Sequence, residues 1–104
     1  MLAQQEYDAL AQQADDQTTY LSFVTQMLQK PACQSVIQLG TEVLPFLFQD
    51  IKDGRFHCHW RMAAITTILE AALLPPVEIS EQFRGKVREM ERIYVEYGVT
   101  HQYI

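Results

Sequence analysis

Glycine and proline divide this chain of 104 residues into segments that can each hold a helix. Neither residue type occurs between Gln4 and Gln29, and the later ones stand where helices would begin or end: Pro31, Gly40, Pro45, Gly54, Pro75, Pro76, Gly85 and Gly98. Between them, apolar residues recur every three or four positions, which is the spacing of one helix face. No segment alternates polar and apolar residues as a half-buried strand does. The sequence therefore predicts an all-α protein.

The first 29 residues carry one apolar helical face without a clear internal boundary. That face consists of Tyr7, Leu10, Ala14, Thr18, Leu21, Val24 and Leu28. These positions fit a single helix from Gln4 to Gln29. They fit equally well a weakly packed N-terminal helix over residues 1–17, followed by a stronger helix that Asp15 or Asp16 caps. The sequence leaves both alternatives open.

Three more helices are expected before the proline pair at Pro75. A short helix runs from Pro31 to Leu39, because proline suits a first turn and Gly40 suits a helix end. The next helix, capped by Thr41, should be central in the core because apolar residues surround it: Val43, Leu44, Phe46, Leu47, Phe48 and Ile51. A mostly buried helix from about His57 to Leu74 follows.

A last helix is predicted from Gly85 to Tyr97, with Gly98 as its end. Its inward stripe consists of Val87, Met90, Tyr94 and Tyr97. Residues 1–104 then form a single domain, a compact bundle of about five helices. The stretches 31–54 and 57–98 each read as a helix pair, so we expect two HEAT-like pairs capped by the N-terminal helix.

The charge of the chain favours a basic partner. The formal net charge is -5, and the first basic residue is Lys30, after four acidic residues. A nucleic-acid-binding protein needs clustered Lys and Arg to hold phosphates, so direct nucleic-acid binding is not expected. The short basic cluster around Arg88 is diluted by neighbouring glutamates such as Glu89 and Glu91.

A cytoplasmic location is the expectation from the N-terminus and the cysteines. The first residues lack the basic, apolar and small-residue layout of a secretion signal. Cys33 and Cys58 then fit free thiols in a reducing compartment. No apolar run approaches the roughly 18 residues that a membrane-spanning helix needs.

Two sites could carry chemistry, and both patterns are weak. His57, Cys58 and His59 are good zinc ligand types. On a helix, however, residues two positions apart point about 200° away from each other, so His57 and His59 would not share one ion. Cys33 lies in a first helical turn, where the dipole could lower its pKa, although a small core cysteine is the commoner outcome. We therefore predict no enzyme, no cofactor and no metal, with a metal-binding protein or hydrolase using His57, His59 and Cys58 as the alternative.

Short motifs between Thr18 and Ile104 resemble those of a known family. They are Lys30-Pro31-Ala32-Cys33-Gln34, Ile37, Leu39-Gly40 and Leu44-Pro45-Phe46-Leu47, then His57, Trp60, Ala64-Ile65-Thr66, Gly85, Met90, Tyr97-Gly98 and Tyr103-Ile104. In this order they resemble a small uncharacterised family of bacterial, notably cyanobacterial, helical proteins. Three features depart from that family. Lys30 stands where the family usually has histidine, and Tyr94 and Tyr97 stand where it has tryptophans. Residues 67–74 lengthen one helix. The resemblance implies a compact HEAT-like fold and no particular chemistry.

The predicted function is a non-enzymatic protein–protein interaction module. We expect an acidic binder of a basic partner surface, of the inhibitor, antitoxin or anti-defence type found in bacteria and phages, with self-association as a further expectation. The residues predicted to bind the partner are the acidic ones of the first helix and four on the last: Glu6, Asp8, Asp15, Asp16, Arg88, Arg92, Tyr94 and Tyr97.

Overall fold

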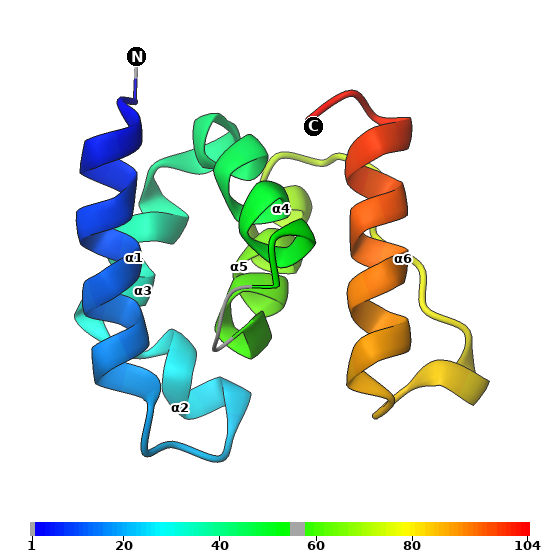
Figure 1. The fold of residues 1–104 in the computed structure, drawn as a ribbon, viewed down its shortest axis with the longest axis horizontal. Coiled ribbons are helices and arrows are strands. Elements are labelled where there is room, and N and C mark those ends of the chain that lie inside the picture. The colour runs from blue at the N-terminus through cyan, green and yellow to red at the C-terminus, as the bar shows by residue number, and fades with distance from the viewer. Residues whose placement is uncertain (1, 55–57) are drawn as a thin grey trace.

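The computed structural model describes residues 2–54 and 58–104, and in this part of the chain it is an all-α bundle without strands (Figure 1). The helices are α1 (Gln4–Thr18), α2 (Val24–Leu28), α3 (Pro31–Gln38), α4 (Leu44–Lys52), α5 (Cys58–Ala71) and α6 (Val87–Thr100), with short 3₁₀ turns η1 (Gly40–Val43) and η2 (Glu81–Phe83). The predicted all-α bundle is confirmed. None of the helices in the described ranges is both long enough and apolar enough to cross a bilayer.

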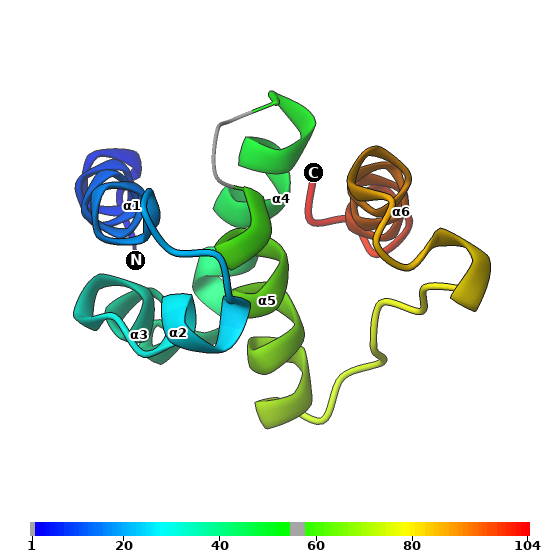
Figure 2. The same ribbon diagram turned by 90° about the horizontal axis from the view of Figure 1, so that it is seen from below.

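Helix α5 lies between two helix pairs (Figure 2). These pairs differ from the expected ones, which joined consecutive helices within residues 31–54 and within residues 57–98. The most extensive contacts join α1 with α3 and α4 with α6, and α5 contacts α2, α3 and α4. Helix α5 also contacts α6, the helix that follows it, but less extensively than α4 does. The long connection after Pro75 carries the chain past α5, so that α6 packs on α4.

The first 29 residues form two helices, and the break lies later than Asp15. Helix α1 ends at Thr18, and Phe23 is extended before α2 begins. The hydroxyl groups of Thr18 and Thr19 bond to the Ala14 and Asp15 carbonyl oxygens, which suits the end of a helix. Helix α1 buries Tyr7 and two alanines, and it contacts α3 along its length. Helix α1 is therefore packed into the bundle, whereas one of the two alternatives left open by the sequence was a weakly packed helix over residues 1–17.

The central position expected for the two apolar helices is confirmed. Helix α4 buries Leu44, Leu47, Phe48 and Ile51, and α5 buries Trp60, Ala64, Ile65 and Leu69. Pro45 lies in the first turn of α4, where a missing amide donor costs no hydrogen bond.

The sequence suggested that Gly98 ends the last helix, and this is wrong. Gly98 instead allows α6 to approach α4 closely. A Cβ atom at Gly98 would lie only 2.9 Å from Cγ of Phe48. Helix α6 continues for two more residues and ends before Gln102, whose φ of 64° starts the return of the chain. A glycine signals either a helix end or a close contact, and here the close contact decided its position.

Candidate functional site

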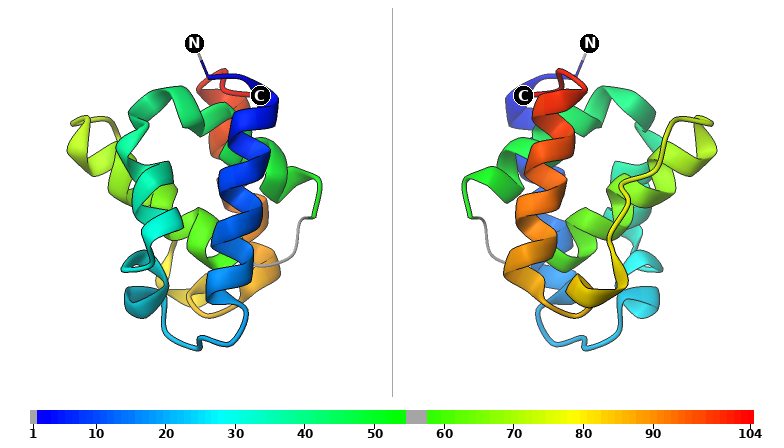
Figure 3. Two further views of the ribbon diagram at one scale, coloured as in Figure 1. Left: turned by 90° about the vertical axis from the view of Figure 1, so that its left-hand side faces the viewer. Right: turned by 90° about the vertical axis from the view of Figure 1, so that its right-hand side faces the viewer.

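The predicted partner-binding residues lie on opposite sides of the molecule and not all of them are exposed. Glu6, Asp8 and Asp16 are exposed on α1, while Arg88 and Arg92 are exposed on α6. Helices α1 and α6 form the two outer sides of the bundle (Figure 3). The residues therefore belong to two separate surfaces.

Tyr94 and Tyr97 are used inside the fold and do not form an exposed aromatic surface. Tyr94 is 5% exposed, and its hydroxyl is 2.8 Å from Oγ1 of Thr66. Burial raises the pKa of Tyr94, and the Thr66 hydrogen bond opposes this only in part. The Tyr97 ring stacks on Phe48, and its hydroxyl donates to the Pro75 carbonyl oxygen. Their place on the inward stripe of α6 is confirmed, with Tyr94 buried and Tyr97 half-buried. Their role as partner-binding residues stays a prediction.

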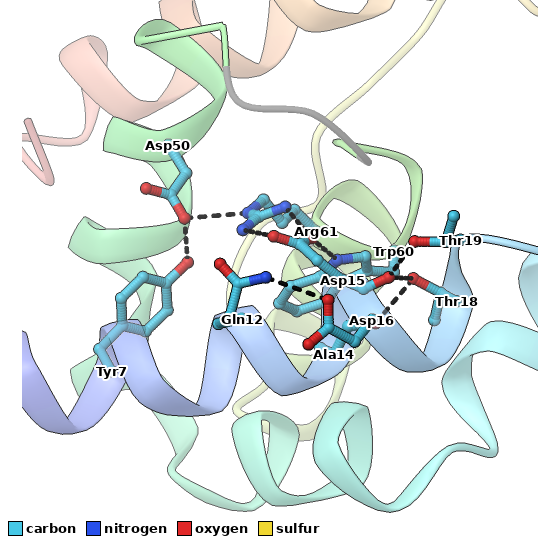
Figure 4. Close-up of polar contacts among 10 residues, drawn as sticks. All are labelled: Tyr7, Gln12, Ala14, Asp15, Asp16, Thr18, Thr19, Asp50, Trp60 and Arg61. Carbon is cyan, nitrogen blue, oxygen red and sulfur yellow. Dashed lines mark hydrogen bonds and ion pairs between the residues drawn. The ribbon is translucent and has the colours of Figure 1, made fainter.

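Asp15 is wrong as a surface residue, because it belongs to a buried ionic network (Figure 4). Arg61 of α5 is fully buried and donates from Nη1 to Oδ1 of Asp15 at 2.7 Å and from Nη2 to Oδ2 at 3.1 Å. Its Nε donates to Oδ2 of Asp50, in α4, at 2.9 Å. Trp60 donates to Oδ1 of Asp15 at 2.8 Å, and the Tyr7 hydroxyl donates to Oδ2 of Asp50 at 2.5 Å. The ionic network thus joins α1, α4 and α5.

The electrostatics of the ionic network keep Arg61 charged and Tyr7 neutral. Burial alone would lower the pKa of Arg61, but the hydrogen bond to Asp15 and the nearby negative charges raise it overall. Burial raises the pKa of Tyr7, and the hydrogen bond to Asp50 raises it further. A guanidinium held by two carboxylates has charge-assisted bonds on both sides, which is the strong form of such a contact.

The ionic network has a structural role and offers little to a ligand. Among the described residues, no buried side-chain nitrogen or oxygen lacks a hydrogen-bond partner. The sequence analysis missed the network, although one signal was present. Asp50 and Arg61 are charged residues inside apolar helical runs, and a charge at such a position needs a buried partner. Asp15 stands among polar residues and gave no such signal.

The described residues offer no metal site. Within residues 2–54 and 58–104, no three His, Cys, Asp or Glu side chains gather closely enough to hold an ion. His57 and the side chain of Cys58 lie outside the described part, and His59 is exposed at the start of α5. Cys33 is buried, and burial together with the charge of Asp15 raises its pKa to about 11. This is the opposite of the lowered pKa that a nucleophilic cysteine needs.

Exposed apolar side chains gather where α1 turns into α2. Tyr20 is 70% exposed, Phe23 67% and Val24 37%, and we call residues 20–24 the aromatic elbow. Nζ of Lys30 lies 3.1 Å from the Tyr20 hydroxyl and 5.4 Å from the centre of its ring. Val24 was expected on the inward apolar face of the first 29 residues, whether these form one helix or two. The two aromatic residues outside that helical stripe were the available signal for an exposed turn.

Comparisons of the chain with protein-family models, with curated proteins and with solved structures found no match. What the protein does must therefore be inferred from its own residues. Three features stand out: the ionic network, which is internal, the aromatic elbow beside the acidic face of α1, and the charged side of α6. Only the last two face solvent and can meet another molecule.

Proposed function

We propose that this protein is a non-enzymatic interaction module that binds a partner protein through the aromatic elbow and the acidic outer face of α1. The observation that carries the proposal is the exposure of Tyr20 and Phe23, by 70% and 67%, directly after an acidic helix. The partner presents a basic surface with an apolar pocket. This places Glu6, Asp8 and Asp16 at the interface and removes Asp15, Tyr94 and Tyr97 from it.

The elbow has the composition of an interface centre. Tyrosine and other aromatic residues are enriched where binding energy concentrates, since each ring removes a large apolar area from water. Lys30 holds the ring and hydroxyl of Tyr20, so part of the ordering cost of binding is already met in the free protein. An exposed tyrosine that is fixed in position is better suited to docking than one that is free to rotate.

The charge of α1 indicates the sign of the partner surface. Glu6, Asp8 and Asp16 are exposed, and no Lys or Arg precedes Lys30 in the sequence. Gln4 and Gln12 donate to Asp8 and Asp16, which orients the carboxylates without neutralising them. An interface of one sign steers a partner of the opposite sign and speeds association.

Small acidic binders of this kind act by covering a basic functional site on another protein. An inhibitor, antitoxin or anti-defence role in a bacterial or phage cytoplasm fits that mode of action, and it belongs to the same proposal. Because the surface is acidic, the partner is a protein and not a nucleic acid. Self-association through the elbow is the competing outcome, and light scattering on the purified protein distinguishes it.

Affinity capture from the native host tests the proposal with three matched baits. The wild-type chain should recover a stoichiometric partner, and a Tyr20→Ser/Phe23→Ser bait should lose it because the docking rings are gone. A bait with Glu6, Asp8 and Asp16 changed to Lys should lose it as well. The control changes three exposed acidic residues elsewhere, Glu70, Glu78 and Glu81, to Lys and alters the net charge equally.

The control bait should retain the partner, since the charge it changes lies away from the elbow. Equal loss with both charge-changed baits would contradict a specific acidic face. Retention by the Tyr20→Ser/Phe23→Ser bait would exclude the elbow. One equivalent of zinc in the purified protein, lost on changing His57 and His59 to Ala, would favour the metal-protein alternative instead.

A further inference from the structure

A second surface lies on the opposite side of the molecule, where the end of α4 meets the outer side of α6. It is an open groove of about 560 Å³. Ile51 and Val95 supply apolar lining, Lys52, Arg88 and Arg92 supply positive charge, and Glu91 and Glu96 supply negative charge. We call this the α4–α6 groove. It shares no residue with the aromatic elbow or with the acidic face of α1.

The three cations of the α4–α6 groove differ in their ion pairs within residues 2–54 and 58–104. Arg92 is held on its own helix by Glu89, at 3.0 Å, and by Glu96, at 2.8 Å. Lys52 and Arg88 form no ion pair with another residue of these ranges. Both are exposed side chains from different helices that line one groove. A ligand with two carboxylates can therefore contact both without displacing an existing ion pair.

The mixture of charges indicates what kind of anion fits. Glu91 and Glu96 line the same groove, so a continuous phosphate backbone would bring negative charge against these glutamates. A polypeptide instead carries discrete carboxylates with apolar side chains between them, which matches two cations beside Ile51 and Val95. The open shape of the groove suits a segment of a protein surface, whereas a small molecule usually binds in a pocket that encloses it.

We propose that the α4–α6 groove binds an acidic segment of a second protein, with Lys52 and Arg88 contacting its carboxylates and Ile51 and Val95 contacting an apolar side chain between them. This goes beyond the binding of a basic partner at the aromatic elbow, because the groove selects the opposite charge on the opposite side of the molecule. The protein would then join two partners of different charge.

The experiment uses the full chain labelled with ¹⁵N and a synthetic dodecapeptide in which glutamate pairs flank leucines. Adding the peptide should shift the backbone amide signals of Lys52, Arg88 and Val95. The same peptide with Gln in place of Glu, and an oligothymidylate of equal charge, should produce weaker shifts there. Fluorescence anisotropy of the labelled peptide then gives the dissociation constants of the variants.

A Lys52→Gln/Arg88→Gln variant should bind the acidic peptide about tenfold more weakly, as expected for two partly exposed charge contacts. The matched control is Arg84→Gln/Lys86→Gln, which removes the same charge from residues outside the groove and should bind normally. Equal weakening in both variants would overturn the proposal, as would shifts that map elsewhere. If the oligothymidylate binds more tightly than the acidic peptide, the ligand of the groove is a nucleic acid and the proposal is overturned.

Discussion

Replacing Arg61 by Met is the sharpest test of the ionic network. The change removes three charge-assisted hydrogen bonds, of 2.7, 2.9 and 3.1 Å, from a side chain that is fully buried. It leaves the carboxylates of Asp15 and Asp50 inside the fold without the guanidinium group of Arg61. Removing one partner of a buried ion pair costs about 3–5 kcal/mol, because the remaining charge is desolvated and uncompensated.

That cost is a large part of the stability of a domain of this size, which totals about 5–15 kcal/mol. We therefore expect the Tm of Arg61→Met to fall by at least about 12 °C, given a shift of about 4–8 °C per kcal/mol for small domains. Thermal and urea unfolding followed by far-UV circular dichroism measure the change. Trp60, the only tryptophan, donates to Asp15, so its fluorescence reports on the ionic network directly.

The control is Arg92→Met, which removes an arginine bound to two glutamates at the surface of α6. Exposed pairs of this kind contribute little because solvent screens them, so this variant should unfold almost as the wild type does. A triple variant, Arg61→Met with Asp15→Asn and Asp50→Asn, should recover part of the loss because no buried charge remains unpaired. The reasoning fails if Arg61→Met costs no more than Arg92→Met, or if the triple variant is less stable than Arg61→Met alone.

Three further outcomes follow from single positions. Gly98→Ala should destabilise the protein by about 1–2 kcal/mol in urea unfolding, because the new methyl group meets the buried Phe48 ring; a gain in stability would show that the ring can move. Leu73 has a φ of 57° and is 93% exposed, so Leu73→Gly should stabilise by roughly 0.5–1 kcal/mol, and a lower Tm would contradict this. With Cys58 changed to Ser, Cys33 should resist a disulfide reagent near neutral pH. Its reactivity should rise as the pH passes from its ordinary pKa of 9 towards about 11, and prompt labelling near neutral pH would disprove its burial.

The helical nature of the chain could be predicted from the spacing of its apolar residues, because helix periodicity is a local property. The central position of α4 and α5 was predictable for the same reason, since a helix with apolar residues all round has to be buried. Proline worked as a signal at Pro31 and Pro45, where the ring fixes a backbone angle without reference to the rest of the fold. Glycine was less informative, because Gly98 serves a contact with another helix.

The exposure of a charged residue was predictable only where that residue does not pair with a buried side chain of opposite charge. Glu6, Asp8 and Asp16 are exposed as the charge pattern suggested, whereas Asp15, one position away, is paired with Arg61 46 residues later. The sequence does not show this pairing, because it depends on how α1 and α5 meet. The same applies to the aromatic elbow, which exists because α1 ends at Thr18 and turns its following residues outward.

By itself the sequence determined that this protein is a helical bundle and that α4 and α5 are its central helices, since these properties follow from residue spacing along one chain. Only the tertiary structure decided which helices are neighbours, and with them the ionic network, the aromatic elbow and the α4–α6 groove. The ionic network and the α4–α6 groove depend on side chains from separate helices, whose distances are set by packing, and the aromatic elbow depends on where α1 ends. The conformational preferences of individual residues do not set such distances. The surfaces proposed to bind partners could therefore be recognised only in the folded molecule.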